Sequence, residues 1–95
     1  MSLHPAPISI TVQLPAYPEK PEWKLDGSVI TIPDIPVSTL FSALREHIKR
    51  AVGADLPISR LRLDYVGKVM NNSATLASVN LDEGDVVYLN VKAKK

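Results

Sequence analysis

Basic side chains and one tyrosine in the C-terminal half of the chain suggest the clearest chemistry. They are Arg60, Arg62, Tyr88, Lys92, Lys94 and Lys95. Arginine and lysine neutralise nucleic-acid phosphates, and a tyrosine ring stacks on a base or a ribose. The whole chain carries 11 basic and 10 acidic residues, a formal net charge of +1. Nucleic-acid binding would therefore have to come from local clustering of these residues, not from overall charge.

Two segments with alternating apolar and polar residues, 60–65 and 86–92, carry most of this set. Successive side chains of a strand point to opposite faces of a sheet. If the two strands pair, the core receives Leu61, Leu63, Tyr65, Val87, Leu89 and Val91. The open face receives Arg60, Arg62, Asp64, Tyr88, Asn90 and Lys92. An ordinary solvated sheet face is the alternative interpretation, and Asp64 weakens a purely electrostatic site.

Other residue types that could support catalysis or metal binding lack the companions they need. The chain has no cysteine, which excludes disulfides, thiol chemistry and cysteine zinc sites. His4 and His47 have no metal-ligand partner at useful spacing. Asp82, Glu83 and Asp85 lack the length and pattern of a calcium loop and indicate a solvated turn. We predict no enzyme activity, catalytic residue, metal, cofactor or small-molecule substrate.

The N-terminal third predicts two strands joined by a long connection. Residues 8–14 alternate with period two, and the prolines of 15–21 then form a stiff connection. An Asp-Gly turn signal precedes a β-branched strand, 29–32, which Pro33 and Pro36 are expected to end. Trp23 in the connection either caps the open end of the core or contacts a ligand. Its position just before a leucine and the turn favours the core.

One amphipathic helix is predicted over 37–52. Its apolar stripe contains Leu40, Leu44, Ile48 and Val52, widened by Val37, Phe41 and Ala51. Charged residues are expected on the solvent side, namely Arg45, Glu46, Lys49 and Arg50. Ser38 or Thr39 is expected to cap its first turn, and Gly53 to end it. Further elements are expected at 60–65, 68–70, 75–79 and 86–91.

A lone amphipathic helix must pack across a sheet that has one apolar face, which predicts an α+β fold of two layers. The expected organisation is a flexible N-terminal segment at 1–7, one domain at 8–92 and a basic end at 93–95. No apolar run approaches the roughly 20 residues of a membrane span, so no membrane partner is expected. We expect a monomeric domain of a larger protein.

The C-terminal sequence RLDYVGKVMNNSATLASVNLDEGDVVYLNVKAKK, from Arg62 onward, resembles the second half of ubiquitin. The resemblance implies a ubiquitin-like β-grasp fold, a mixed sheet of four to five strands with one helix across it. Upstream, ISITVQLP and EWKLDGSVITI resemble the carboxy-terminal ubiquitin-like domain of the large subunit of splicing factor 3a. That family implies a nuclear role in pre-mRNA splicing within the U2 small nuclear ribonucleoprotein. It also implies that a stem-loop of U1 small nuclear RNA contacts the sheet surface and the basic tail.

Several positions depart from the family pattern. The family has an Arg-Gly-Gly-type tail where this chain ends in Lys-Ala-Lys-Lys. Its aromatic residue and lysine in the short-strand turn align with Val69 and Asn71, and a tyrosine aligns near Val79. Ubiquitin-like conjugation is not expected, because no Gly-Gly end is present. Two hypotheses follow from the resemblance. The domain contacts small nuclear RNA, or it docks another spliceosomal protein without direct RNA contact.

Overall fold

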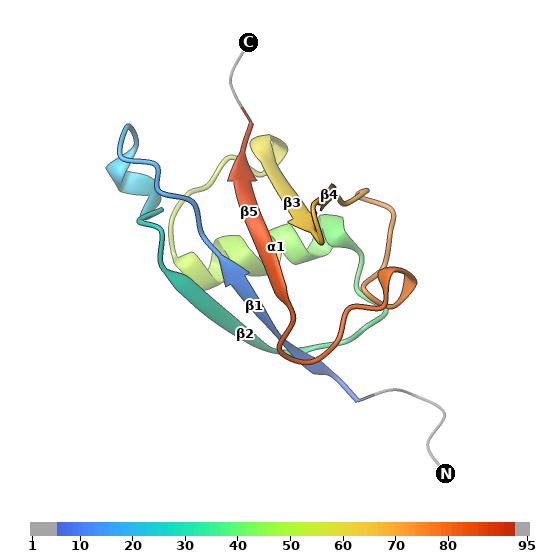
Figure 1. Ribbon diagram of the computed structural model, residues 1–95. Coiled ribbons are helices and arrows are strands. Elements are labelled where there is room, and N and C mark those ends of the chain that lie inside the picture. The colour runs from blue at the N-terminus through green and yellow to red at the C-terminus, as the bar shows by residue number, and fades with distance from the viewer. Residues whose placement is uncertain (1–5, 93–95) are drawn as a thin grey trace.

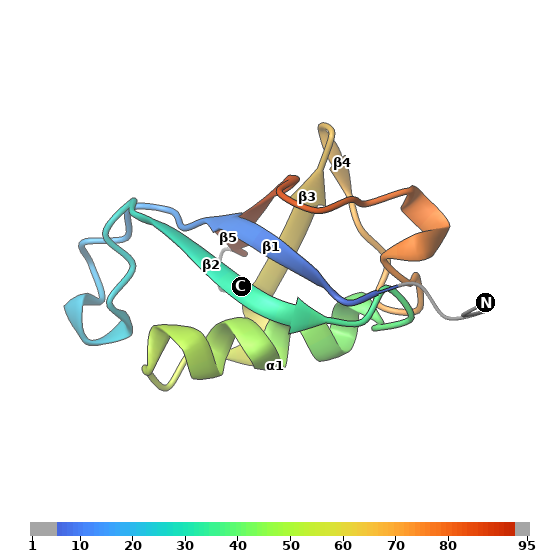
Figure 2. The same ribbon diagram turned by 90° about the horizontal axis from the view of Figure 1, so that it is seen from below.

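The computed structural model describes residues 6–92 and contains a five-stranded sheet with one α-helix across a single face (Figures 1 and 2). The strands are β1 (Ile8–Gln13), β2 (Val29–Ile35), β3 (Leu61–Tyr65), β4 (Lys68–Val69) and β5 (Val86–Val91). The helices are α1 (Phe41–Val52) and the 3₁₀ turns η1 (Pro21–Trp23), η2 (Ile58–Arg60) and η3 (Ala77–Val79). The strand order is β2-β1-β5-β3-β4, with β1 and β5 parallel and the other pairs antiparallel. The predicted mixed sheet and the predicted α+β fold are both confirmed.

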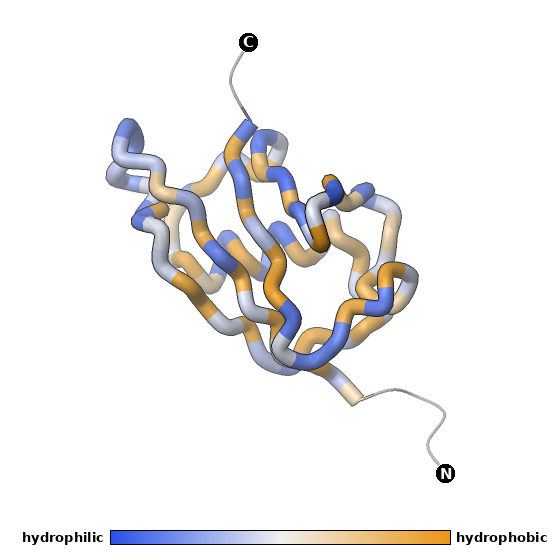
Figure 3. The backbone as a smooth tube through the Cα atoms, in the orientation of Figure 1, coloured by the Kyte–Doolittle hydropathy of each residue, from blue (hydrophilic) through white to orange (hydrophobic). Residues whose placement is uncertain are grey.

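The core lies between the sheet and α1. Figure 3 shows apolar and polar residues alternating along the strands, as a sheet with one buried face requires (Figure 3). Leu61 and Leu63 of β3 and Val87 and Leu89 of β5 are buried, as the alternation predicts. The helix contributes Phe41, Leu44 and Ile48 to the same core. Within residues 6–92 no polar or charged residue is buried, so apolar packing alone forms this core.

The second strand continues beyond the predicted end, because Pro33 lies inside β2. Between the pairs Ile10–Ile32 and Ile8–Ile35, two residues of β2 oppose one residue of β1, which is a β-bulge. Asp34 adopts a left-handed conformation with φ of 61° at the bulge. Proline donates no ladder hydrogen bond, yet β2 is an edge strand, where this loss is tolerated.

The helix begins at Phe41, four residues later than predicted, and no side chain caps it. Thr39 instead closes a turn by donating its N–H to the carbonyl of Pro36 (3.0 Å). The free N–H of Phe41 donates to the carbonyl of Ala74 (3.0 Å), so main chain from a distant loop does the work of a cap. Gly53 ends α1 as predicted, with φ of 75°. In the described part of the chain, no helix has the length and apolar character needed to cross a membrane.

Candidate nucleic-acid interface

The face of the sheet opposite α1 carries the predicted polar residues of β3 and β5. Arg62 pairs with Asn90 across the two strands, and Asp64 pairs with Tyr88. The Arg62 side chain is exposed, and Tyr88 is 52% exposed, so its ring is accessible for stacking. The register thus brings one cation and one aromatic ring together on the open face, as the alternation predicts.

Asp64 lies beside these two groups and partly compensates the positive charge of Arg62. Its Oδ2 accepts a hydrogen bond from Arg62 Nη2 at 3.1 Å and another from Asn90 Nδ2 at 2.9 Å. The pair is partly exposed, with 43% of the Arg62 side chain and 20% of the Asp64 side chain accessible, so water screens it only in part. A guanidinium has five N–H donors, so one contact to Asp64 leaves most of them free for a ligand.

Arg60 does not lie on the open face, contrary to the prediction. It is the last residue of η2, ahead of β3, so the strand alternation does not reach it. Its Nε donates to the carbonyl of Lys92 at 3.0 Å, and the Lys92 N–H donates to the Arg60 carbonyl at 2.7 Å. Its guanidinium carbon lies 5.5 Å from the centre of the Trp23 ring. Arg60 therefore links the start of β3, the end of β5 and the Trp23 ring at this end of the sheet.

Trp23 is buried in the core cluster, with 9% of its surface exposed, which confirms the core interpretation. The ring stacks on Tyr17 with centroids 5.2 Å apart and an interplanar angle of 22°. Lys20 Nζ and the Arg60 guanidinium both approach it at cation–π distances, 5.8 and 5.5 Å. The indole shapes the end of the domain and is not free to stack on a base.

Lys92 is exposed directly after β5 and is held beside Arg60 by their paired main-chain bonds. The ion pairs among the described residues are Lys49–Asp55 and Arg62–Asp64, so neither Arg60 nor Lys92 has a carboxylate within 4.0 Å there. The predicted site residues Lys94 and Lys95 lie outside the described residues. Arg60 and Lys92 thus lie together at the C-terminal end of β5, the end of the strand that lies uppermost in Figure 1.

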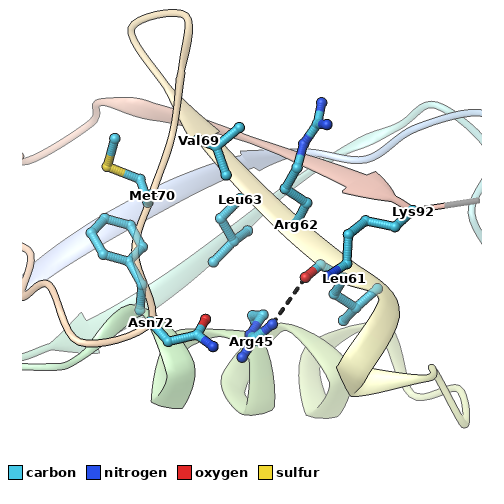
Figure 4. A pocket seen from close by; sticks show the side chains of 9 residues that line it. Arg45, Leu61, Arg62, Leu63, Val69, Met70, Asn72 and Lys92 are labelled. Carbon is cyan, nitrogen blue, oxygen red and sulfur yellow. Dashed lines mark hydrogen bonds between the residues drawn. The ribbon is translucent and has the colours of Figure 1, made fainter.

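A pocket of about 140 Å³ opens beside this basic end, between α1 and the β3–β4 edge (Figure 4). Arg62 and Lys92 line it together with Arg45 from α1. The sequence placed Arg45 on the solvent side of the helix, which is wrong. It is half-buried, and its Nη1 donates to the carbonyl of Leu61 at 3.0 Å. Its four-residue spacing from the buried Phe41 was the signal that predicts a shared face.

The opposite end of β5 begins at an acidic turn. The carboxylate of Asp85 accepts hydrogen bonds from Tyr65 OH at 2.7 Å and from the Asp82 N–H at 2.8 Å. The Tyr65 bond is the main reason that the pKa of Asp85 is lowered and that of Tyr65 is raised. Glu83 accepts from the Ser9 N–H at 2.9 Å. Across residues 6–92 no group of three potential metal ligands gathers. The carboxylates of Asp85 and Glu83 are instead hydrogen-bonded to Tyr65 and to main-chain N–H groups.

Comparison with known proteins defines the class. Residues 23–94 match the ubiquitin family, and the chain belongs to that family. The solution structure of the N-terminal ubiquitin-like domain in the 4931431F19Rik protein superposes with a TM-score of 0.72. That comparison covers 94% of this chain and 78% of the other at 15% identity, and it supports the fold alone. The ubiquitin-like β-grasp fold implied by the sequence is confirmed.

A narrower similarity is to splicing factor 3A subunit 1. The proteins of Bos taurus and Homo sapiens are 34% identical to this chain over 88 residues, and that of Mus musculus is 33% identical. The match covers 93% of the chain but only 11% of the length of these relatives. The chain is therefore a ubiquitin-like domain homologous to a short part of this splicing-factor subunit, as the resemblance predicted.

Proposed function

We propose that this chain is a non-catalytic binding module of a nuclear pre-mRNA splicing factor within the U2 small nuclear ribonucleoprotein. In this proposal it contacts small nuclear RNA, a U1 stem-loop, through the basic end of its open sheet face and its C-terminal lysines. The homology to splicing factor 3A subunit 1 supports the splicing context. The observation that carries the RNA contact is the gathering of Arg60, Arg62 and Lys92 where two of them lack a carboxylate partner in the described chain.

Each group has a role that its geometry allows. Arg62 and Lys92 are exposed and neutralise backbone phosphates. Tyr88, half exposed between Gln13 and Asp64 in the sheet register, offers its ring for stacking on an unpaired base or a ribose. Arg60 positions Lys92 through the main chain and adds its charge to the edge. Because phosphate contacts dominate, binding should weaken steeply as salt rises.

The test is the affinity of the domain for a U1 stem-loop hairpin, measured by fluorescence anisotropy across a salt series. Three neutralised phosphates predict a slope of log K against log salt of about −2 to −3. Arg62→Glu should cut low-salt affinity by at least about tenfold, because it replaces a phosphate contact with a repulsive charge. The matched control is Arg50→Glu, the same charge change on the exposed side of α1, which should leave affinity nearly unchanged. Equal losses in both variants would contradict the site.

A second candidate is docking of another spliceosomal protein without direct RNA contact. The favouring observation is the turn between β3 and β4, where Val66 is 76% and Val69 58% exposed. Exposed apolar side chains at one turn could form part of a protein contact, because contiguous apolar surface marks such sites. Salt separates the two functions, since an apolar protein contact is insensitive to ionic strength and an RNA contact is not.

A further inference from the structure

The pocket between α1 and the β3–β4 edge is lined by three cations. Arg45, Arg62 and Lys92 surround it with the amide of Asn72, and apolar side chains such as Met70 complete its walls (Figure 4). No carboxylate lines it. Asp64 compensates part of the Arg62 charge from outside the pocket. A concave site with a net positive charge concentrates anions, because its low-dielectric walls focus the field.

Arg45 has a hydrogen-bonding capacity that the described chain leaves unused. Its Nη1 donates to the carbonyls of Leu61 at 3.0 Å and Ile58 at 3.4 Å, which fixes the guanidinium in place. Its Nε–H is buried and has no hydrogen-bond partner among residues 6–92. No carboxylate in that range lies within 4.0 Å of it. Buried polar groups in folded proteins are normally satisfied, so an unpaired charged donor beside a pocket calls for an acceptor there.

We propose that this pocket seats one phosphate of the RNA backbone, with Arg45 as its fixed donor and Arg62 and Lys92 at its rim. This inference rests on the proposed function and extends it from the open face around the sheet edge to α1. A guanidinium presents a planar set of donors that matches phosphate geometry. Continuity favours RNA as the source, because Arg62 and Lys92 belong both to the pocket and to the basic end of the sheet.

Salt dependence tests the contact, because each neutralised phosphate contributes a countable amount to the slope. Arg45→Met keeps an unbranched apolar stem and removes the charge. It should reduce the size of the slope for the U1 stem-loop by about 0.7 to 0.9. Arg50→Met, the same change at an exposed position of α1, should leave the slope unaltered. Should Arg45→Met lose its folded amide spectrum, the Arg45 Nε–H resonance of the unmodified protein tests the contact instead.

The Arg45 Nε–H resonance provides a second readout in the unmodified protein. RNA hairpin should move this resonance at low salt, and inorganic phosphate should move it more weakly. A hairpin that binds with an unshifted Nε–H and an unchanged slope in Arg45→Met would overturn the pocket inference and leave the proposed function standing. Absence of any hairpin binding would overturn both. A resonance that responds to phosphate alone would assign the pocket to a free anion and overturn the RNA assignment.

Discussion

The two ends of β5 carry opposite charge and use it differently. At its start, the carboxylates of Asp85 and Glu83 accept hydrogen bonds from Tyr65, from the Asp82 N–H and from the Ser9 N–H. At its other end, Arg60 and Lys92 bond each other through main-chain carbonyls, and neither has a carboxylate within 4.0 Å in residues 6–92. The carboxylates of the acidic end accept hydrogen bonds from the protein itself, whereas the cations of the basic end have no carboxylate contact in residues 6–92.

This difference shows how charged surface clusters with similar composition can be distinguished. A charge that already has protein donors around it stabilises the fold and gains little from a ligand. A charge whose protein contacts are only neutral carbonyls or an aromatic ring keeps its attraction for an opposite charge. This criterion supports the proposal that the basic end binds RNA, and Arg62 is intermediate because Asp64 compensates part of its charge.

The largest effect is expected at the basic end, from loss of the aromatic support beneath it. Trp23→Ala removes a ring that is nearly buried and stacked on Tyr17. We expect a loss of about 3 to 5 kcal/mol in the free energy of unfolding, measured by urea denaturation. Lys20→Ala, which removes only a cation over the same ring, should cost about 1 kcal/mol or less. Equal losses in the two variants would mean that the ring does not support this end through packing.

A smaller effect is expected where the two kinds of charge meet on the open face. Asp64→Asn removes the negative charge beside Arg62 while keeping a side chain of similar shape. RNA affinity at low salt should rise by about twofold to tenfold, because one opposing charge leaves the site. Asp55→Asn, in the ion pair with Lys49 at the far end of α1, serves as the control and should change nothing. A fall in affinity with Asp64→Asn would mean that the carboxylate positions Arg62 for binding.

The smallest effect is expected at the acidic end and concerns pH. The lowered pKa of Asp85 means that its ionised form stabilises the fold above the unfolded pKa, and that this contribution is lost as pH falls through the folded value. The raised pKa of Tyr65 adds stability that is lost only as pH rises above about 10. Tyr65→Phe should therefore be less stable than wild type at neutral pH. The difference should shrink below about pH 4 and again in alkali, measured by urea denaturation. A difference independent of pH would contradict this account.

Local periodicity predicted the residues whose positions depend only on their own strand. Arg62 and Tyr88 lie on the open face and Leu61 and Leu63 in the core, because alternation by two is a property of the strand itself. The start of α1 was missed, because the cap is the main chain of Ala74, which is distant in sequence.

Two arginines of the site were misplaced for a related reason. Arg60 is the last residue of a 3₁₀ turn. The alternation of polar and apolar residues in the sequence includes Arg60, so nothing in that pattern marks where the turn ends and β3 begins. Arg45 donates a hydrogen bond to the carbonyl of Leu61, and this contact forms only when α1 packs against the sheet. The sequence pattern predicts the helices and strands themselves. It does not predict which donors and acceptors on different elements pair, because that depends on how the elements pack.

The measurement that tests the central claim most directly is an amide-resolved NMR titration of this domain with a U1 stem-loop hairpin, at low and at physiological salt. The account predicts shifts clustered at Arg60, Arg62, Tyr88 and Lys92 that weaken as salt rises, with the Ser9, Asp82 and Asp85 amides unmoved. Shifts confined to the acidic end or to Val66 and Val69, or no shifts at either salt, would contradict it.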